Sequence, residues 1–232
     1  MQRREFTGLS VSVGAMLALA QMRAYALDLA SLTNADASAG LRTALEKGAA
    51  QAVKTLSAKD GFLGNPKVKI QLPPALENAA NLMRTLGQGE QVDALVTSMN
   101  RGAEAAVPMA QPLLVKAVKN MSIQDAKAIL SGGDTGATQF FAQKTRSGLT
   151  VQFLPAVSKA TEKVGLAQKY NQLAGKAADM GLMKREDASI QKYVTDKALD
   201  GLYFMIGQEE QALRQNPGKY GSALLSKVFG AL

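Results

Sequence analysis

Four side chains that could do chemistry recur at helical spacing near the end of the chain: Tyr193, Asp196, Asp200 and Tyr203. Separations of three and four residues place them along one face of a helix. The two carboxylates repel each other there unless a positive charge lies between them. An Arg or Lys from another helix, such as Arg101, would supply that charge as an internal ion pair. Ca²⁺ or Mg²⁺ is the alternative, because both cations prefer oxygen ligands.

These four residues, with Arg101 and Glu104, are the candidate ligand-binding residues. In an enzyme, at least two of Arg101, Glu104, Tyr193, Asp196 and Asp200 would converge on an open cleft. Such a cleft would favour a hydrolase or lyase that uses Asp, Glu, Lys and Tyr. Side chains that pair only with each other would favour a binding protein. We assign no catalytic residue, and we expect no cofactor unless carboxylates bind one of the two divalent cations.

The composition excludes several kinds of chemistry. The 232-residue chain has no His and no Cys, so it lacks imidazole and thiolate ligands, thiol nucleophiles and disulfides. Aromatic residues make up only 5%, and the abundance of unbranched side chains favours helices. The net charge of +8 is scattered along the chain. Nucleic acid is therefore not an expected partner, although weak attraction to anionic envelope surfaces is.

The string Asp134-Thr135-Gly136 matches the active-site string of aspartic proteases. That chemistry needs two aspartates that share a proton, and no second copy of the string is present. We therefore expect Asp134 to cap the N-terminus of the helix that follows.

The first residues have the pattern of an export signal. Arg3 and Arg4 precede an apolar stretch over 8–20 and an A-x-A motif that ends at Ala26. The paired arginines resemble a twin-arginine signal, and the general secretory route or a buried N-terminal helix are the alternatives. We expect a twin-arginine signal peptide over 1–26, cleavage after Ala26 and a periplasmic protein.

The rest of the chain, 27–232, is expected to fold as a single all-α domain. The patterns predict a bundle of about eight helices with one short extended segment, and no second apolar run is long enough for an integral membrane span. Pro155 and Gly165 are expected to divide the chain between helices. The expected helices cover 36–57, 74–86, 90–107, 122–130, a stretch that begins at Asp134, 186–215 and a short C-terminal stretch, and the extended segment covers 66–73.

Several stretches resemble one bacterial family. They are Thr33–Leu41, Asp60–Pro66, Ser98–Arg101 with Ala106–Pro108, and Lys197–Leu202. The family is known only as a domain of unknown function, number 4197, and the resemblance extends over essentially the whole mature chain. It implies an exported, mainly helical protein and brings no functional residues with it.

These observations together favour a non-enzymatic binding or interaction protein of the cell envelope. Its partner would be an envelope protein or a small ligand. A hydrolase or lyase is one alternative. A carrier of lipid or of a small apolar ligand is another, and it would require an enclosed apolar cavity.

Overall fold

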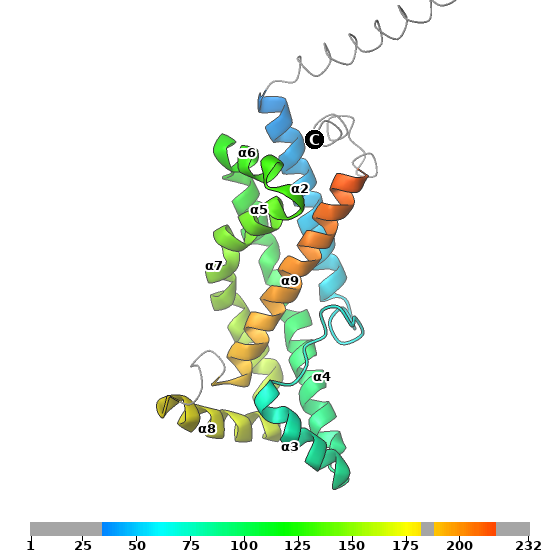
Figure 1. The fold of residues 1–232 in the computed structure, drawn as a ribbon, viewed down its shortest axis with the longest axis vertical. Helices are drawn as coiled ribbons and strands as arrows, with labels where there is room; N and C mark the ends of the chain where they lie inside the picture. Colours follow the sequence, from blue (N-terminus) through cyan, green and yellow to red (C-terminus); the bar gives the residue numbers. More distant parts are fainter. Residues whose placement is uncertain (1–33, 182–187, 217–232) are drawn as a thin grey trace, which may run out of the picture.

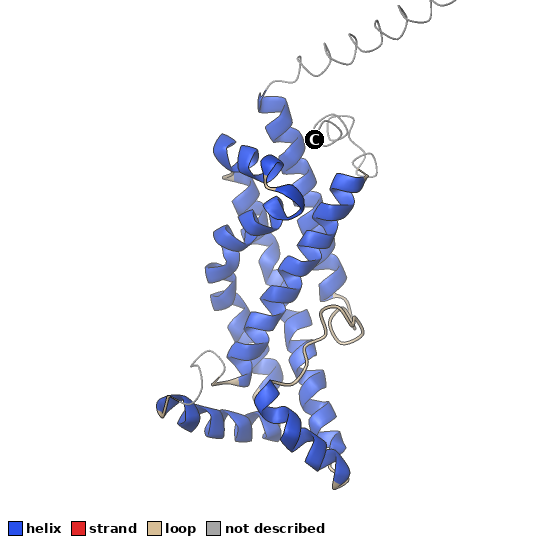
Figure 2. Cartoon of the chain, in the orientation of Figure 1, coloured by secondary structure: helices blue, strands red, loops and turns tan. Residues whose placement is uncertain are grey.

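The computed structural model describes residues 34–181 and 188–216, and these residues form helices and loops with no β-strand among them (Figure 2). The all-α prediction is confirmed. Within this part of the chain there are eight α-helices, as the expected bundle of about eight requires. They are α2 (Asn34–Ser57), α3 (Pro74–Thr85), α4 (Gly89–Ala106), α5 (Ala110–Lys119), α6 (Ile123–Ser131), α7 (Gly136–Thr161), α8 (Gly165–Asp179) and α9 (Ile190–Gln215), with short 3-10 helices η1 (Val107–Met109) and η2 (Gly133–Thr135).

The long helices form an elongated bundle. Helices α7 and α9 pack along each other at its centre, α4 packs mainly on α7, and α2 packs mainly on α9. Helices α5 and α6 lie near the end of the bundle where α2 begins, whereas α3 and α8 lie at the opposite end (Figure 1). The segment between α2 and α3 crosses the bundle beside α9 as a loop.

Apolar side chains at helical spacing fill the space between these helices. Leu95 and Met99 of α4, Phe153 of α7 and Leu199 of α9 are completely buried. Removing such side chains from water is the main favourable contribution to folding. On α9, buried apolar residues occur on more than one face of the helix, and this explains its central position: Val194, Ala198, Leu199, Leu202 and Ile206.

The N-terminus of α6 agrees with the sequence pattern. The Ser122 hydroxyl accepts the Asp125 N–H at 3.0 Å, and the Asp125 carboxylate accepts the Ser122 N–H at 2.9 Å, which completes a capping box. Lys144 of α7 lies 3.4 Å from the same carboxylate. Hydrogen bonds from the backbone and side chain of Ser122, assisted by Lys144, lower the pKa of Asp125.

Two expectations about α7 are wrong. Asp134 lies in η2 and does not cap α7, because a carboxylate from α9 occupies the first backbone N–H groups of that helix. Pro155 does not divide the chain but lies inside α7. An interior proline costs a helix about 3 kcal/mol, but Phe153 and Val157 on either side are fully buried, and their packing holds the helix together.

The expected extended segment, 66–73, lies over the helices as a strap, and it has no β-ladder partner among the described residues. Its first three residues are not extended but form a turn, in which the N–H groups of Val68 and Lys69 bond the Asn65 carbonyl. The predicted leader at 1–26, the first residues of the helix predicted from 186 and the short C-terminal helix lie outside the described residues. Within the described ranges, no helix combines the length and apolarity that crossing a membrane would take.

Candidate functional site

A buried asparagine holds the strap against the bundle. Asn100 of α4 is completely buried, and its amide oxygen accepts the Ile70 N–H at 2.9 Å. Its amide nitrogen donates to the Ile70 carbonyl at 2.9 Å and to the Val96 carbonyl at 2.8 Å. One side chain thus pairs with both backbone groups of Ile70, as a neighbouring strand would, and fixes the position of the strap.

A buried carboxylate holds the loop that precedes the strap. Glu104 of α4 is only 6% exposed, and one of its oxygens accepts the N–H groups of Phe62 and Leu63 at 3.0 and 3.1 Å. Arg101 binds the other oxygen and also donates to Asp60 at 2.7 Å. The hydrogen bond with Glu104, followed by the weaker contribution of the one with Asp60, raises the pKa of Arg101. Arg101 and Glu104 are therefore satisfied by the loop.

A glycine on α9 makes room for the same loop. The Phe62 ring is completely buried against Gly201, where an added Cβ atom would lie 2.7 Å from a ring carbon. Val68 of the strap is the next neighbour, at 3.4 Å. The family-like stretches Asp60–Pro66 and Lys197–Leu202 thus meet at this contact. Residues of these two stretches hold the loop and the strap against α4 and α9.

The strap and α9 enclose an open groove of about 500 Å³. Its walls combine basic, aromatic and aliphatic side chains with strap backbone. The lining residues are Lys67, Val68, Lys69, Ile70, Gln71, Tyr193, Lys197, Asp200, Gly201 and Phe204. A concave surface of this size falls in the range of binding sites for small molecules and peptides.

The charge in the groove is mainly positive. Lys67 and Lys197 are exposed, and Lys69 is partly exposed. The Lys197 ammonium lies 5.9 Å from the centre of the Tyr193 ring and 3.8 Å from the Asp200 carboxylate. Asp200 is the one carboxylate among the lining residues, and it is already bound by an arginine of α7. The lysines therefore leave the groove with unbalanced positive charge.

The expected cation between Asp196 and Asp200 is Arg146 of α7. Its guanidinium lies 2.8 Å from Asp200 and 3.9 Å from Asp196. The prediction of an arginine or lysine from another helix is confirmed, but the choice of Arg101 is wrong, because Arg101 is committed to the loop through Glu104. No cluster of three or more acidic residues suited to a metal ion occurs in the described ranges.

The two predicted tyrosines have different surroundings. The Tyr193 hydroxyl donates to the Gln71 carbonyl at 3.2 Å and so ties α9 to the strap. Tyr203 is buried, with its hydroxyl 2.9 Å from that of Thr145, which itself donates to a backbone carbonyl. Burial raises the pKa of Tyr203, whereas Thr145 and Arg146 oppose the shift. Tyr193 and Asp200 line the groove, and Asp196 and Tyr203 are not among the lining residues.

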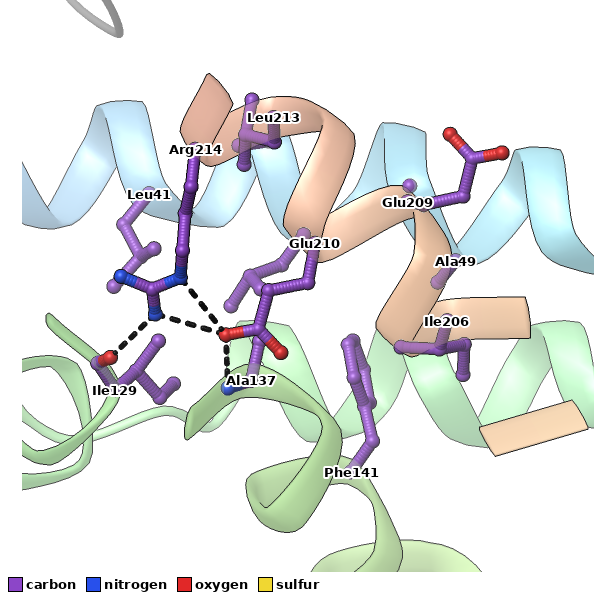
Figure 3. A pocket seen from close by; sticks show the side chains of 13 residues that line it. Leu41, Ala49, Ile129, Ala137, Phe141, Ile206, Glu209, Glu210, Leu213 and Arg214 are labelled. Atoms are coloured by element: carbon purple, nitrogen blue, oxygen red, sulfur yellow. Dashed lines mark hydrogen bonds and ion pairs between the residues drawn. The ribbon is translucent and has the colours of Figure 1, made fainter. Parts of the chain in front are cut away.

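A second buried carboxylate escaped the sequence analysis. Glu210 of α9 is 5% exposed and accepts the N–H groups of Ala137 and Thr138, both at 2.9 Å, at the start of α7. Arg214 bonds Glu210 at 2.8 Å and the Ile129 carbonyl at 2.9 Å (Figure 3). The spacing of Glu210 and Arg214 was visible in the sequence, but their contact with α7 depends on the packing of α9.

These residues border a small apolar cavity between α2, α7 and α9. Leu41, Ile129, Phe141 and Leu213 are among the residues around it (Figure 3). Its volume is about 20 Å³, which is room for roughly one water molecule. Because Glu210 already has partners for both oxygens, this region joins helices rather than presenting a reactive group.

The fold and groove define the class: an all-α protein in which two buried side chains of one helix fix a strap, through Asn100, and the loop before it, through Glu104, beside an open basic groove. The chain belongs to the family described as protein of unknown function DUF4197, whose profile matches residues 31–230. No curated protein and no solved structure matches the chain.

Proposed function

We propose that this chain is a non-enzymatic binding protein of the cell envelope and that it takes its partner or ligand in the groove between the strap and α9. The supporting observation is that Asn100 holds the strap and Glu104 holds the loop before it, next to three lysines. A surface that is already ordered loses little conformational entropy when a ligand binds, so this rigidity favours recognition.

The arrangement of the polar groups favours binding over hydrolase or lyase chemistry. Tyr193 and Asp200 both line the groove, which meets one requirement for an active site. However, the Tyr193 hydroxyl donates to a strap carbonyl and Asp200 is held by Arg146. Arg101 and Glu104 are committed to the loop instead of the groove. The groups that an acid–base mechanism would need are thus engaged in holding the fold.

A lipid carrier has less support. The apolar cavity beside Glu210 measures about 20 Å³, which is too small for an acyl chain. The larger groove is lined by lysines, which do not suit an apolar guest.

The location in the envelope rests on the first 26 residues. Arg3, Arg4 and the A-x-A motif that ends at Ala26 support twin-arginine export to the periplasm. Replacing both arginines by lysine is expected to leave the uncleaved chain in the cytoplasm. Equal amounts of processed protein in the periplasm of cells with and without this change would contradict the export proposal.

Lysine footprinting tests whether the groove is occupied in the cell. Intact cells and purified protein are treated with a small amine-reactive reagent, and the labelled fraction of each lysine is measured by mass spectrometry. We expect Lys67, Lys69 and Lys197 to be less labelled in cells than in the purified protein. Lys119 and Lys159, exposed on other helices, are the internal controls. Equal labelling of groove and control lysines in both samples would contradict the proposed function.

A further inference from the structure

The strap has one backbone edge that is bound and one that is open. Asn100 bonds both the N–H and the carbonyl of Ile70, which requires the two groups to point to the same side, as in extended backbone. The backbone groups of Lys69 and Gln71 then point to the opposite side. Tyr193, which lines the groove, bonds the Gln71 carbonyl, so this second edge faces α9 and the groove.

Two backbone groups on this edge are free to pair with another chain. The Lys69 N–H donates to the Asn65 carbonyl at 2.8 Å, and the Gln71 carbonyl accepts from Tyr193. The Lys69 carbonyl and the Gln71 N–H have no hydrogen-bond partner among the described residues. An acceptor and a donor two residues apart form the pattern to which one residue of an added strand pairs.

The side chains around this edge select the chemistry of such a strand. Lys67, Lys69 and Lys197 present positive charge, and they outnumber the single lining carboxylate, Asp200, which pairs with Arg146 and Lys197. Phe204 is 42% exposed at the same wall and offers an apolar surface. A strand alternates its side chains between two faces, so one set could meet the lysines while the other meets the aromatic wall.

We propose that the groove binds an extended, acidic segment of a partner polypeptide, which adds to the open edge of the strap and sets its carboxylates against Lys67, Lys69 and Lys197. This inference rests on the proposed function of the groove and names the class of its partner. Charge complementarity supports it, because acidic side chains would balance the lysines and steer the encounter. The fixed position of the strap supports the added strand, because a template that moves would lose pairing energy.

The test measures peptide binding to the full chain by fluorescence anisotropy. The probe is a labelled hexapeptide that alternates glutamate and valine. A second peptide carries an N-methyl group on every residue, so it keeps the charge but has no backbone N–H with which to pair with the Lys69 carbonyl. A third peptide replaces glutamate by lysine. We expect the first peptide to bind and the other two to bind at least about tenfold more weakly, since each loses backbone pairing or charge.

Protein variants locate the site. Lys69→Glu and Lys197→Glu are expected to weaken binding of the first peptide by about tenfold or more, because each reverses a charge in the groove. Lys197 lies on α9, so its replacement alters no residue of the strap, and weaker binding by both variants would not be explained by a distorted strap. Lys119→Glu on α5 is the matched control and is expected to bind as the natural chain does. Circular dichroism verifies that every variant keeps its helical content.

Three results would overturn the inference. Equal binding of the methylated peptide would show attraction by charge without strand addition. Equal weakening by Lys119→Glu and Lys197→Glu would show that the groove is not the site. No binding of any peptide, in a protein whose groove lysines are protected in cells, would show that the groove takes another ligand, and the proposed function would then stand without this inference.

Discussion

Replacing Gly201 by alanine provides the sharpest test of how the strap is seated. Gly201 is inside α9, and an added Cβ atom would lie 2.7 Å from one carbon of the Phe62 ring and 3.2 Å from another. Carbon atoms attract best at about 3.5–4.0 Å, so the ring would have to move by roughly 1 Å. Phe62 is completely buried and its backbone is bonded to Glu104, which leaves it little freedom to move.

Two opposing contributions set the size of the effect. Alanine is favoured over glycine inside a helix by about 1 kcal/mol. Overpacking a close-packed site costs about 1–3 kcal/mol. The shortest contact here, 2.7 Å, is far below normal van der Waals separation, so we expect a cost in the upper part of that range, about 2–3 kcal/mol. We therefore expect Gly201→Ala to lower the free energy of unfolding by about 1–2 kcal/mol. For a chain of this size, that corresponds to a fall in Tm of about 2–8 °C.

Urea and thermal unfolding, followed by circular dichroism at a helical wavelength, measure this change. Gly48→Ala is the matched control, because it also lies inside a helix but its nearest neighbour, a Cβ atom of Glu209, would be at 3.5 Å. It is expected to raise the free energy of unfolding by up to about 1 kcal/mol. Adding Phe62→Leu to Gly201→Ala should cost less than the sum of the two single changes, because the smaller side chain relieves the contact.

Either of two outcomes would refute this reasoning. A Gly201→Ala protein as stable as the natural one would mean that the ring moves freely. Additive effects of Phe62→Leu and Gly201→Ala would mean that the two residues are not coupled through this contact.

Three further predictions concern groups outside the strap. Glu210→Gln is expected to lower the free energy of unfolding, measured by urea denaturation, by about 2–4 kcal/mol, because it removes the charge that binds both the start of α7 and the guanidinium of Arg214. Glu162→Gln, at an exposed position, is the control and should change this free energy by less than about 0.5 kcal/mol. Asp125→Asn should cost about 0.5–1 kcal/mol at neutral pH, in line with a helix cap. Because the pKa of Asp125 is lowered from 3.8 by folding, this difference should disappear as the pH falls through the lowered pKa, and an unchanged difference in strong acid would contradict the assignment. Tyr203→Phe should cost about 1 kcal/mol below pH 10, and because the pKa of Tyr203 is raised by burial, the advantage of the natural chain should shrink in Tm measurements above pH 10.

Helix boundaries were predictable where local chemistry sets them. The capping box at Ser122 and the proline at position 74, in the first turn of α3, are both visible within four residues of sequence. The start of α7 was not predictable in this way. Asp134 is the nearest suitable residue, yet Glu210, more than 70 residues away, occupies the N–H groups, because the antiparallel packing of α7 on α9 brings it there.

The candidate site likewise has features that local sequence sets and features that only helix packing sets. The spacing of Tyr193, Asp196, Asp200 and Tyr203 determined that they share α9 and that the two carboxylates need a cation. Only the tertiary structure decided that this cation is Arg146, because the choice depends on which residue of α7 lies opposite in the packed bundle. Periodicity along one helix is a local property, whereas the partner of each side chain depends on how separate helices pack. The sequence by itself thus determined an all-α chain with a strap, and packing alone assembled the lysine-lined groove from the strap and α9.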